Sequence, residues 1–591
     1  MSQPQQPQFD LKNIILATAL SMLIVFGWQY YYAGPAAKKA QEQASTQQQA
    51  TTQIATTAES TVKDRATVIA ATKRVPIDTP ALSGSINLKG AALDDLHLNK
   101  YRETVDPTSP LITLLSPSGT QDAYFVEQGF VAAPGSSVEV PGKDTEWQAQ
   151  DGAALKAGTP VILTWDNGKG VKFTREISVS DDYLFTTKDT VENTSATPVA
   201  LQAYGVVQRE DTPKIGGYST FFEGLIGLQS SGLQEFAYAK LKKDPETVNQ
   251  VPAKGGWSGF TDKYWSTVVI PDKSTNVRAF YNFKAIPGRD GYQAGYRSDD
   301  VQTVQPGASL TYEDHVYAGA KVVQTINAIE SKYQFDRFNK MIDWGWFSLI
   351  TQPMFYLLSF VHGLVGNFGI AILIVTVLVK AAVFPLANRS YASMSKMKNL
   401  KPQMDAIKEQ YPDDKLKQQQ ETMELYKREK VSPMAGCLPI FVQIPIFFSL
   451  YKVILTTIEL RQAPFFGWIQ DLSVPDPTSV FNLFGLLPFH PPAALMLGFW
   501  PLLMGVTMWV QMRLNPAPPD PVQAQMFNWM PVIFTYSMAG FPAGLTIYWA
   551  WSNFLSIVQQ SYIMKKHGTE FNLFGNIRQS LPFLKKKPAT T

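Results

Sequence analysis

A single lysine interrupts the apolar stretch Ile370–Phe384 of this 591-residue chain. An ammonium group in hydrocarbon costs roughly 2.5–3.5 kcal/mol on insertion scales, so such a lysine normally marks a water-filled cavity or an ionic partner. The alternative is that the four-carbon stem of Lys380 snorkels toward the lipid headgroups. Lys452, near the outer end of another apolar segment, is expected to snorkel in this way.

Polar residues in other apolar segments favour the cavity. Thr376 lies one helical turn before Lys380 and shares its face, and Gln443 stands among apolar neighbours. A further polar stripe, with Trp549 beside it, comprises Tyr548, Ser552, Ser556 and Gln559. Such stripes often only join helices, which is the interpretation we favour for Ser556. Because no acidic residue is evident in these segments to neutralise Lys380, we predict a hydrated groove, better suited to a polypeptide than to a small solute.

Residue patterns for catalysis are missing from the sequence. Motifs for nucleotide binding, zinc proteolysis and serine hydrolysis do not occur. Five histidines lie in distant segments without a neighbouring cysteine, namely His97, His315, His362, His490 and His567. We therefore expect no enzymatic activity, no cofactor and no metal site. An enzyme would require His97, His315 and carboxylates to converge in the region before residue 335.

The composition points to lipid contact. Charged residues make up only 17% of the chain and aromatic residues 12%, whereas about a quarter of a soluble chain is usually charged. The net charge of +3 gives no indication of nucleic-acid binding, so we expect no DNA partner. With Cys437 as its single cysteine, the chain can form no intrachain disulfide.

Long apolar segments predict six transmembrane helices. The first, within an anchor of residues 1–33, is Ile14–Tyr32, for which a cleaved signal peptide is the less favoured alternative. Residues 34–60 are rich in Ala, Gln, Thr and Ser and predict a flexible linker. The other five fall in a core of residues 367–565 and are Phe368–Leu386, Leu438–Leu455, Ala493–Gln511, Met526–Gly540 and Ala543–Ile563.

Residues 61–335 instead show short strand signals, which predict an antiparallel β-sandwich. Val161–Trp165 and Val171–Val179, joined across Asn167–Gly168, predict a hairpin with period-two alternation. Further expected strands are Thr187–Val191, Val199–Val207, Trp265–Ile270, Val277–Phe283 and Ser309–Tyr317. Residues 336–366 are dense in aromatic side chains and predict an amphipathic helix in the membrane interface; an early extension of the next span is the alternative.

The distribution of Lys and Arg predicts the orientation. The loop 387–433 contains ten such residues and the tail after Ile563 six, whereas Thr457–Pro492 contains only Arg461. The loop and the basic tail 566–591 are therefore expected in the cytoplasm. Six spans in the inner membrane then place both termini in the cytoplasm and the β-sandwich in the periplasm.

The loop 387–433 predicts a helical hairpin, broken at Pro412 and capped by an Asp. Four methionines in it are adaptable side chains of the kind found on promiscuous binding surfaces, namely Met394, Met397, Met404 and Met423. They either pack the two helices together or contact a client protein or lipid.

Eight segments contain motifs that match a known family, namely Val379–Leu386, Met394–Met397, Lys427–Pro433, Gly436–Pro439, Gln443–Phe447, Ile458–Pro464, Phe541–Gly544 and Tyr548–Asn553. In combination they resemble the YidC/Oxa/Alb family of membrane protein insertases. The first anchor and the large external domain resemble the Gram-negative form. The resemblance implies insertion and chaperoning of nascent membrane proteins, alone or with the Sec translocon. It also implies contacts with membrane lipids and, through the basic tail, with the ribosome.

Carried over to this chain, the resemblance implies a client-binding groove in the inner leaflet formed by Lys380, Thr376, Gln443, Tyr548, Trp549 and Ser552. Two positions differ from the usual pattern: Lys380 stands where members usually have Arg, and Trp549 where they commonly have Tyr. Phe481–Pro492 has no counterpart in that pattern. The alternative function, a small-solute transporter, predicts inverted repeats and paired intramembrane charges, which the sequence lacks.

Overall fold

The computed structural model describes residues 62–214, 221–244, 251–412, 414–431, 438–489, 491–492, 495–515 and 521–566. The predicted anchor 1–33 and linker 34–60, and all but the first residue of the tail 566–591, lie outside the described residues. So do Cys437, His490 and His567.

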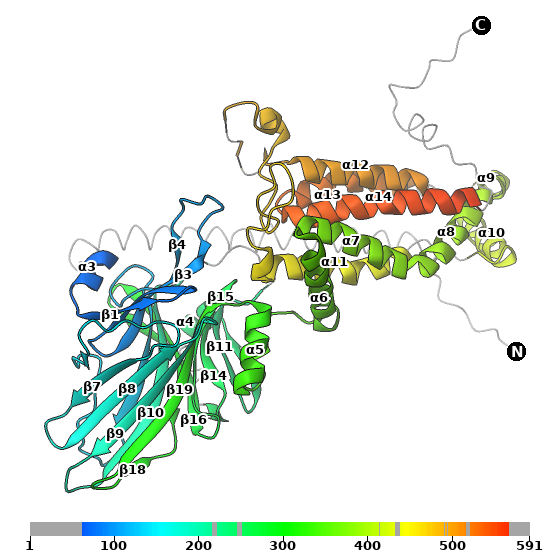
Figure 1. Cartoon of the computed structure of the whole chain (residues 1–591). Coiled ribbons are helices and arrows are strands. Elements are labelled where there is room, and N and C mark those ends of the chain that lie inside the picture. The colour runs from blue at the N-terminus through cyan, green and yellow to red at the C-terminus, as the bar shows by residue number, and fades with distance from the viewer. Residues whose placement is uncertain are drawn as a thin grey trace, which may run out of the picture. The chain divides into compact units, whose positions relative to one another are not determined.

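The β-region is a sandwich of two antiparallel sheets (Figure 1). One sheet has the order β1 (Arg74–Asp78), β2 (Leu82–Asn87), β3 (Ala92–Arg102), β5 (Tyr124–Ala132), β10 (Val199–Glu210), β17 (Arg289–Ser298), β16 (Asn276–Ile286) and β13 (Val251–Lys254), with β4 (Leu111–Leu115) and β18 (Gln302–Val304) alongside. The other has the order β12 (Gly232–Phe236), β11 (Gly224–Gln229), β14 (Trp257–Thr261), β15 (Trp265–Ile270), β19 (Ser309–Ala320), β9 (Leu184–Asn193), β8 (Val171–Val179), β7 (Val161–Asp166) and β6 (Gln148–Ala149). The predicted β-sandwich is confirmed.

The predicted hairpin is also confirmed. β7 and β8 pair antiparallel with Val161 opposite Ile177, and the tight turn between them has Gly168 at a φ of +68°. Alternate residues of β8 are buried, as the period-two pattern requires. The five other predicted strands fall within β9, β10, β15, β16 and β19. Large aromatic side chains from both sheets fill the space between them, and Trp257, Phe260 and Tyr296 are each at most 1% exposed.

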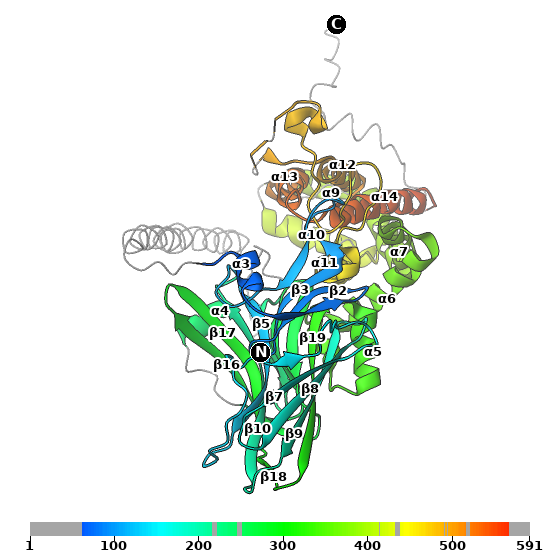
Figure 2. The ribbon, with the colours of Figure 1, turned by 60° about the vertical axis from the view of Figure 1, so that its left-hand side comes forward.

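The other main elements of the described chain are helices (Figure 2). They are α5 (Val323–Tyr333), α6 (Ser348–Val365), α7 (Phe368–Ala382), α8 (Phe384–Asn399), α9 (Lys401–Gln410), α10 (Lys415–Arg428), α11 (Leu438–Thr456), α12 (Phe499–Leu514), α13 (Pro521–Met538) and α14 (Ala543–Lys566), besides the short α3 (Arg65–Ala70) and α4 (Tyr238–Lys243). α14 packs against α7 and α12, and α6 packs against α7 and α11.

Several of the predicted apolar segments have different bounds in the structure, including Met526–Gly540, which corresponds to α13 (Pro521–Met538). The segment Phe368–Leu386 is split, because α7 ends at Ala382 and the chain bends by 67° into α8, which has Pro385 in its first turn. In the segment Ala493–Gln511, α12 begins at Phe499. Within the loop 387–433, predicted as a helical hairpin, the structure has most of α8 followed by α9 and α10, and Asp414 accepts a hydrogen bond from the Lys417 N–H at 3.0 Å and so caps α10.

Length and hydropathy identify fewer membrane-crossing helices than the sequence predicts. Within the described ranges, α6 alone is long and apolar enough to cross a bilayer, and the bent pair α7–α8 adds a second if it forms one span. The structure therefore does not confirm six transmembrane helices. α6 lies in the segment predicted as interfacial. It ends at Val365, with Gly366 in the left-handed conformation, so it is a separate helix from α7 and not an early extension of it.

Candidate functional site

Lys380 lies in the last turn of α7 and reaches side chains from two other helices. Its Nζ donates a hydrogen bond of 2.8 Å to Ser556 Oγ on α14 and one of 3.3 Å to Gln443 Oε1 on α11. The Gln443 amide in turn donates to the Tyr548 hydroxyl on α14. These contacts form a continuous polar chain across α7, α11 and α14.

This polar chain borders a cavity of about 420 Å³ enclosed mainly by α7, α8 and α11–α14. All six predicted groove residues line it: Lys380, Thr376, Gln443, Tyr548, Trp549 and Ser552. Lys380 is the only charged side chain among the residues that line the cavity. The structure thus brings the predicted set together around one cation whose partners there are uncharged oxygen atoms.

Individual side chains contribute to the cavity wall in different ways. The Thr376 hydroxyl donates to the Ile372 carbonyl of its own helix at 2.6 Å, so its hydrogen is already satisfied. Trp549 meets Phe447 edge to face at 4.6 Å between ring centroids and lies 5.7 Å from Phe534. Its indole therefore joins α11, α13 and α14 on the apolar side of the cavity.

Ser556 is predicted to join helices, and the structure shows which contact it makes. It accepts the shorter of the two Lys380 hydrogen bonds, which links α14 to α7, and it is 4% exposed. Its position in the polar stripe, four residues after Ser552, was the available signal. The cavity also has lining residues that were not predicted as site residues, including Tyr391, Met508, Gln511, Met512, Asn515, Met530 and Gln559.

The four methionines of the loop lie in different environments. Met394 is 7% exposed, packs with Ala387, Tyr391 and Ile563, and lines the cavity. Met397 and Met404 pack into the cluster that joins α9 to α10. Met423 is 45% exposed on α10. The Met423 side chain is therefore exposed to a possible ligand, whereas the other three methionines contact their own chain.

Lys452 on α11 differs from the snorkelling lysine that the sequence predicted. Its Nζ pairs with Asp343 Oδ2 at 2.7 Å, and its side chain is only 11% exposed. Asp343 lies outside the apolar segments and 109 residues away in sequence, so local spacing gave no signal for the pair.

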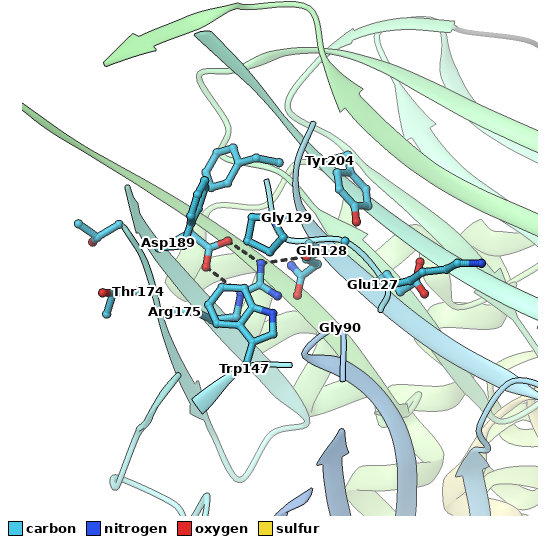
Figure 3. A pocket seen from close by; sticks show the side chains of 15 residues that line it. Gly90, Glu127, Gln128, Gly129, Trp147, Thr174, Arg175, Asp189 and Tyr204 are labelled. Atoms are coloured by element: carbon cyan, nitrogen blue, oxygen red, sulfur yellow. Dashed lines mark hydrogen bonds and ion pairs between the residues drawn. The ribbon is translucent and has the colours of Figure 1, made fainter. Parts of the chain in front are cut away.

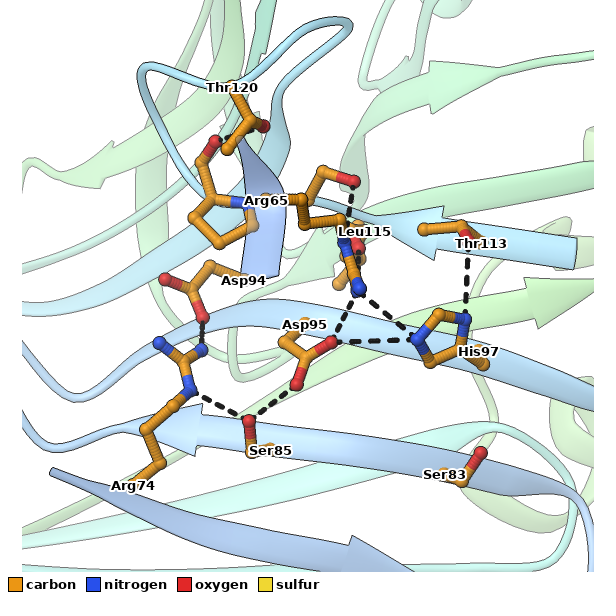
Figure 4. A network of polar contacts seen from close by, with 12 residues as sticks. Arg65, Arg74, Ser83, Ser85, Asp94, Asp95, His97, Thr113, Leu115 and Thr120 are labelled. Atoms are coloured by element: carbon orange, nitrogen blue, oxygen red, sulfur yellow. Dashed lines mark hydrogen bonds and ion pairs between the residues drawn. The ribbon is translucent and has the colours of Figure 1, made fainter. Parts of the chain in front are cut away.

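The two histidines of the sandwich do not come together. His97 on β3 contacts Thr113 through Nδ1 and Arg65 through Nε2, each at 3.2 Å, in a cluster that also pairs Arg65 with Asp95 (Figure 4). His315 is on β19 of the other sheet, 3.0 Å from the Thr186 hydroxyl. Burial lowers the pKa of both imidazoles, for His315 to about 4, so both are neutral at pH 7.

A small cavity in the sandwich lies beside a buried ion pair (Figure 3). The guanidinium of Arg175 donates to both carboxylate oxygens of Asp189 at 2.7 Å and lies 5.3 Å from the Trp147 ring centroid. The cavity measures about 10 Å³, which is room for about one water molecule. Across the described ranges, no group of three His, Cys, Asp or Glu residues is arranged to hold a metal ion.

The fold and the site define a class of protein in which a large β-sandwich precedes an apolar helical region with a cationic polar cavity. Two family models match the chain: "YidC periplasmic domain" over residues 74–357 and "60Kd inner membrane protein" over residues 360–570. With these matches and the relatives below, the chain belongs to the YidC membrane protein insertase family.

Curated relatives match over nearly the whole chain. The "Membrane protein insertase YidC" of Nitrobacter hamburgensis is 50% identical, covering 98% of this chain and 99% of the relative. The protein of the same name from Rhizobium meliloti is 50% identical with the same coverage, and that of Bradyrhizobium diazoefficiens is 49% identical over 96% of this chain and 98% of its own. Among solved structures, an active YidC insertase crystal structure with its first transmembrane domain resolved covers 82% of this chain and 92% of that chain, with 18% identity and a TM-score of 0.35.

Proposed function

We propose that this protein inserts integral membrane proteins into the inner membrane and assists their folding, with the Lys380 cavity as the client-binding groove. The observation that carries the proposal is a cation held by two neutral oxygen acceptors in a cavity of about 420 Å³. The names of the relatives, which match along almost the full length, point to the same activity.

The groove acts on a client in two ways. The positive charge of Lys380 attracts an acidic or polar segment that enters from the cytoplasmic side, because the attraction is strong where few other charges and little water screen it. The polar lining from Gln443, Tyr548 and Ser552 gives that segment hydrogen-bond partners inside the apolar region. Both effects lower the cost of moving polar backbone and side chains across the bilayer.

The aromatic and methionine side chains of the cavity serve the apolar part of the client. Trp549, Phe447 and Phe534 form one wall, and Met508, Met512 and Met530 line the cavity with adaptable side chains. A transmembrane segment leaves along this wall toward lipid. No bond is made or broken and no nucleotide is needed, since the driving force is the transfer of apolar surface out of water.

The membrane arrangement belongs to the same proposal. Six spans place the N-terminus, the α9–α10 hairpin and the C-terminal tail in the cytoplasm and the β-sandwich in the periplasm, in agreement with the concentration of Lys and Arg in the loop 387–433. Nascent membrane proteins are the clients, and the Sec translocon is a partner. The exposed Met423 contacts clients as they arrive, and the basic tail meets anionic lipid or the ribosome.

The test is reconstitution of the full chain in liposomes without nucleotide, followed by insertion of a single-span protein with an acidic tail. We expect Lys380→Met to abolish most insertion of this client and Lys380→Arg to retain it, because the charge is kept. Lys452→Met is the matched control, since this lysine also sits on an apolar helix but is paired with Asp343. Equal insertion by the wild type and Lys380→Met would contradict the groove. Uptake of small solutes without insertion would favour a transporter.

A further inference from the structure

The segment before α12 is apolar and without charge. Residues 477–512 contain no Asp, Glu, Lys or Arg, a run that begins after Asp476 and ends before Arg513. The second part of this uncharged run, from Phe499, lies in α12. The first part includes the short 3-10 turn Val480–Gly485 and continues to Phe489, and we call residues 480–489 the apolar loop.

The apolar loop turns its apolar side chains outward. Six of its large side chains are between 41% and 82% exposed: Phe481, Leu483, Phe484, Leu486, Leu487 and Phe489. Its polar side chain points inward, since Asn482 is 9% exposed, donates to the Phe489 carbonyl at 3.2 Å and accepts from the Gly485 N–H at 3.0 Å. A loop in water normally has its polar side chains facing outward and its apolar side chains buried, so this arrangement is the reverse.

The backbone of the apolar loop is held by specific hydrogen bonds. The Phe484 N–H donates to the Ser479 carbonyl at 2.7 Å, and the Leu487 N–H donates to the Asn482 carbonyl at 3.1 Å. Leu483 and Phe484 both have left-handed φ values, +51° and +58°, which non-glycine residues rarely adopt. The structure therefore keeps these side chains facing outward at the cost of backbone strain, which indicates that the outer face meets an apolar environment.

The apolar loop continues directly onto the apolar surface of the helical region. The Phe484 ring meets Phe499 edge to face at 6.2 Å, and Phe499 meets Trp468 at 5.4 Å and Trp500 at 5.7 Å. Tryptophan side chains, such as Trp468 and Trp500 in this cluster, are typical of the headgroup level of a membrane. The absence of charge from the loop also differs from a protein-docking surface, which carries a polar rim.

We propose that the apolar loop is a lipid anchor, inserted into the outer-leaflet interface beside the start of α12. Leu486 and its apolar neighbours contact acyl chains, while Asn482 and the loop backbone satisfy one another within the loop. This inference rests on the membrane location of the helical region given under the proposed function. It concerns a different surface from the Lys380 groove and needs no client.

The test places single fluorophores on the full chain in liposomes. In a Cys437→Ser background, Leu486→Cys is labelled with an environment-sensitive dye, which suits a position that is 82% exposed and whose substitution leaves packing intact. Ile162→Cys on β7, at 54% exposed, is the matched aliphatic control on the sandwich, and Val532→Cys on α13, at 57% exposed, is the control within the helical region. Quenchers are iodide in water and nitroxides at a shallow and a deep carbon of the lipid chain.

We expect the shallow nitroxide to remove roughly half of the emission from the Leu486→Cys label and iodide to have little effect, because interfacial segments lie ~5–10 Å into the headgroup boundary. The Ile162→Cys label should respond to iodide alone and the Val532→Cys label to the deep nitroxide. Strong iodide quenching at position 486 with lipid quenching at 532 would overturn the anchor and leave the proposed function standing. Iodide quenching at both positions would overturn the membrane arrangement itself. Shielding at 486 that appears only when a client is added would identify a protein as the occupant and overturn the anchor.

Discussion

Arg175 and Arg209 in the sandwich and Lys380 in the helical region have different kinds of partners. Arg175 is 3% exposed and doubly bonded to Asp189, and Arg209 pairs with Asp262 at 2.7 Å. Lys380 instead donates to a serine and an amide, and acidic residues are absent from the lining of its cavity. A cation with an internal carboxylate has its charge neutralised within the fold, whereas Lys380 keeps a charge that a ligand can meet.

The kind of partner that a buried cation has indicates whether the cation contributes to stability or to function. Removing one partner of a buried ion pair leaves an uncompensated charge and destabilises the fold strongly. Removing a cation that has only neutral partners leaves no opposite charge behind, so the fold should lose little. Changes at each cation therefore test whether its role is structural or functional, and we order them from the largest expected effect on stability to the smallest.

Arg175→Met should have the largest effect. It leaves the buried carboxylate of Asp189 without its cation, and we expect a loss of about 3–5 kcal/mol in the unfolding free energy of the sandwich. The measurement is pulse proteolysis of the full chain in detergent across a urea series. Arg278→Met is the matched control, because its pair with Asp299 is exposed and should contribute less than about 1 kcal/mol. Equal losses in both variants would break the distinction between buried and exposed pairs.

Asp314 should make the stability of the sandwich depend on pH. Burial, and then the neighbouring Asp189, raise the pKa of its carboxyl from 3.8 to about 7, so the folded state holds a proton that the unfolded state releases between these values. This stabilising contribution is complete below about pH 4 and is lost as the pH rises through about 7. His315 contributes the opposite slope, since its pKa is lowered to about 4 from 6.5.

The variant Asp314→Asn separates the pH dependence due to Asp314 from that due to His315. The asparagine oxygen can still accept the 2.6 Å hydrogen bond that Tyr296 donates to the carboxylate, so the variant imitates the protonated acid. We expect the stability of Asp314→Asn relative to the wild type to increase from about pH 4 to pH 7, by a few kcal/mol in total. Urea unfolding at four pH values checks this. A difference that does not change with pH would show that Asp314 is ionised in the folded protein.

The sequence was sufficient for the sandwich but not for the ends of the helices. Period-two alternation and Asn167–Gly168 located the β7–β8 hairpin because both signals are local. Apolar content did not locate the start of α12, because the uncharged run of residues 477–512 includes both the apolar loop and most of the helix. Pro385 was a local signal for the bend between α7 and α8. The prediction was based on apolar composition alone and therefore treated the two helices as one span.

The candidate site was predictable in its residues but not in its contacts. An isolated lysine and a polar stripe are visible in single segments, so Lys380 and Ser552 could be proposed as neighbours of a groove. The hydrogen bond from Lys380 to Ser556 joins residues 176 positions apart, and no local spacing encodes such a contact. The ion pair between Lys452 and Asp343 could not be predicted for the same reason. The two residues are far apart in the sequence, so Lys452 was expected to have no ionic partner.

Lys452→Met should have an intermediate effect. Lys452 and Asp343 are 11% and 28% exposed, so water screens the charge that remains after the change, and we expect a loss of about 1–2 kcal/mol. The double variant Lys452→Met/Asp343→Asn should recover part of this loss, because no charge is then left unpaired. Proteolysis across a urea series measures all three chains. Additive losses in the double variant would show that the two side chains do not interact.

Lys380→Met should have the smallest effect on stability and a large effect on insertion. The change removes two hydrogen bonds to neutral acceptors but also removes an ammonium group from a partly apolar cavity, so the terms oppose each other and the net change should stay within about 1 kcal/mol. Unfolding of the helical region, followed in the reconstituted chain, should match the wild type while insertion is lost. Since the methionine also fills the space of the lysine stem, packing of α7 against α14 is kept. A loss of stability as large as that of Arg175→Met would instead make Lys380 a structural cation, and the contrast between the two regions would no longer hold.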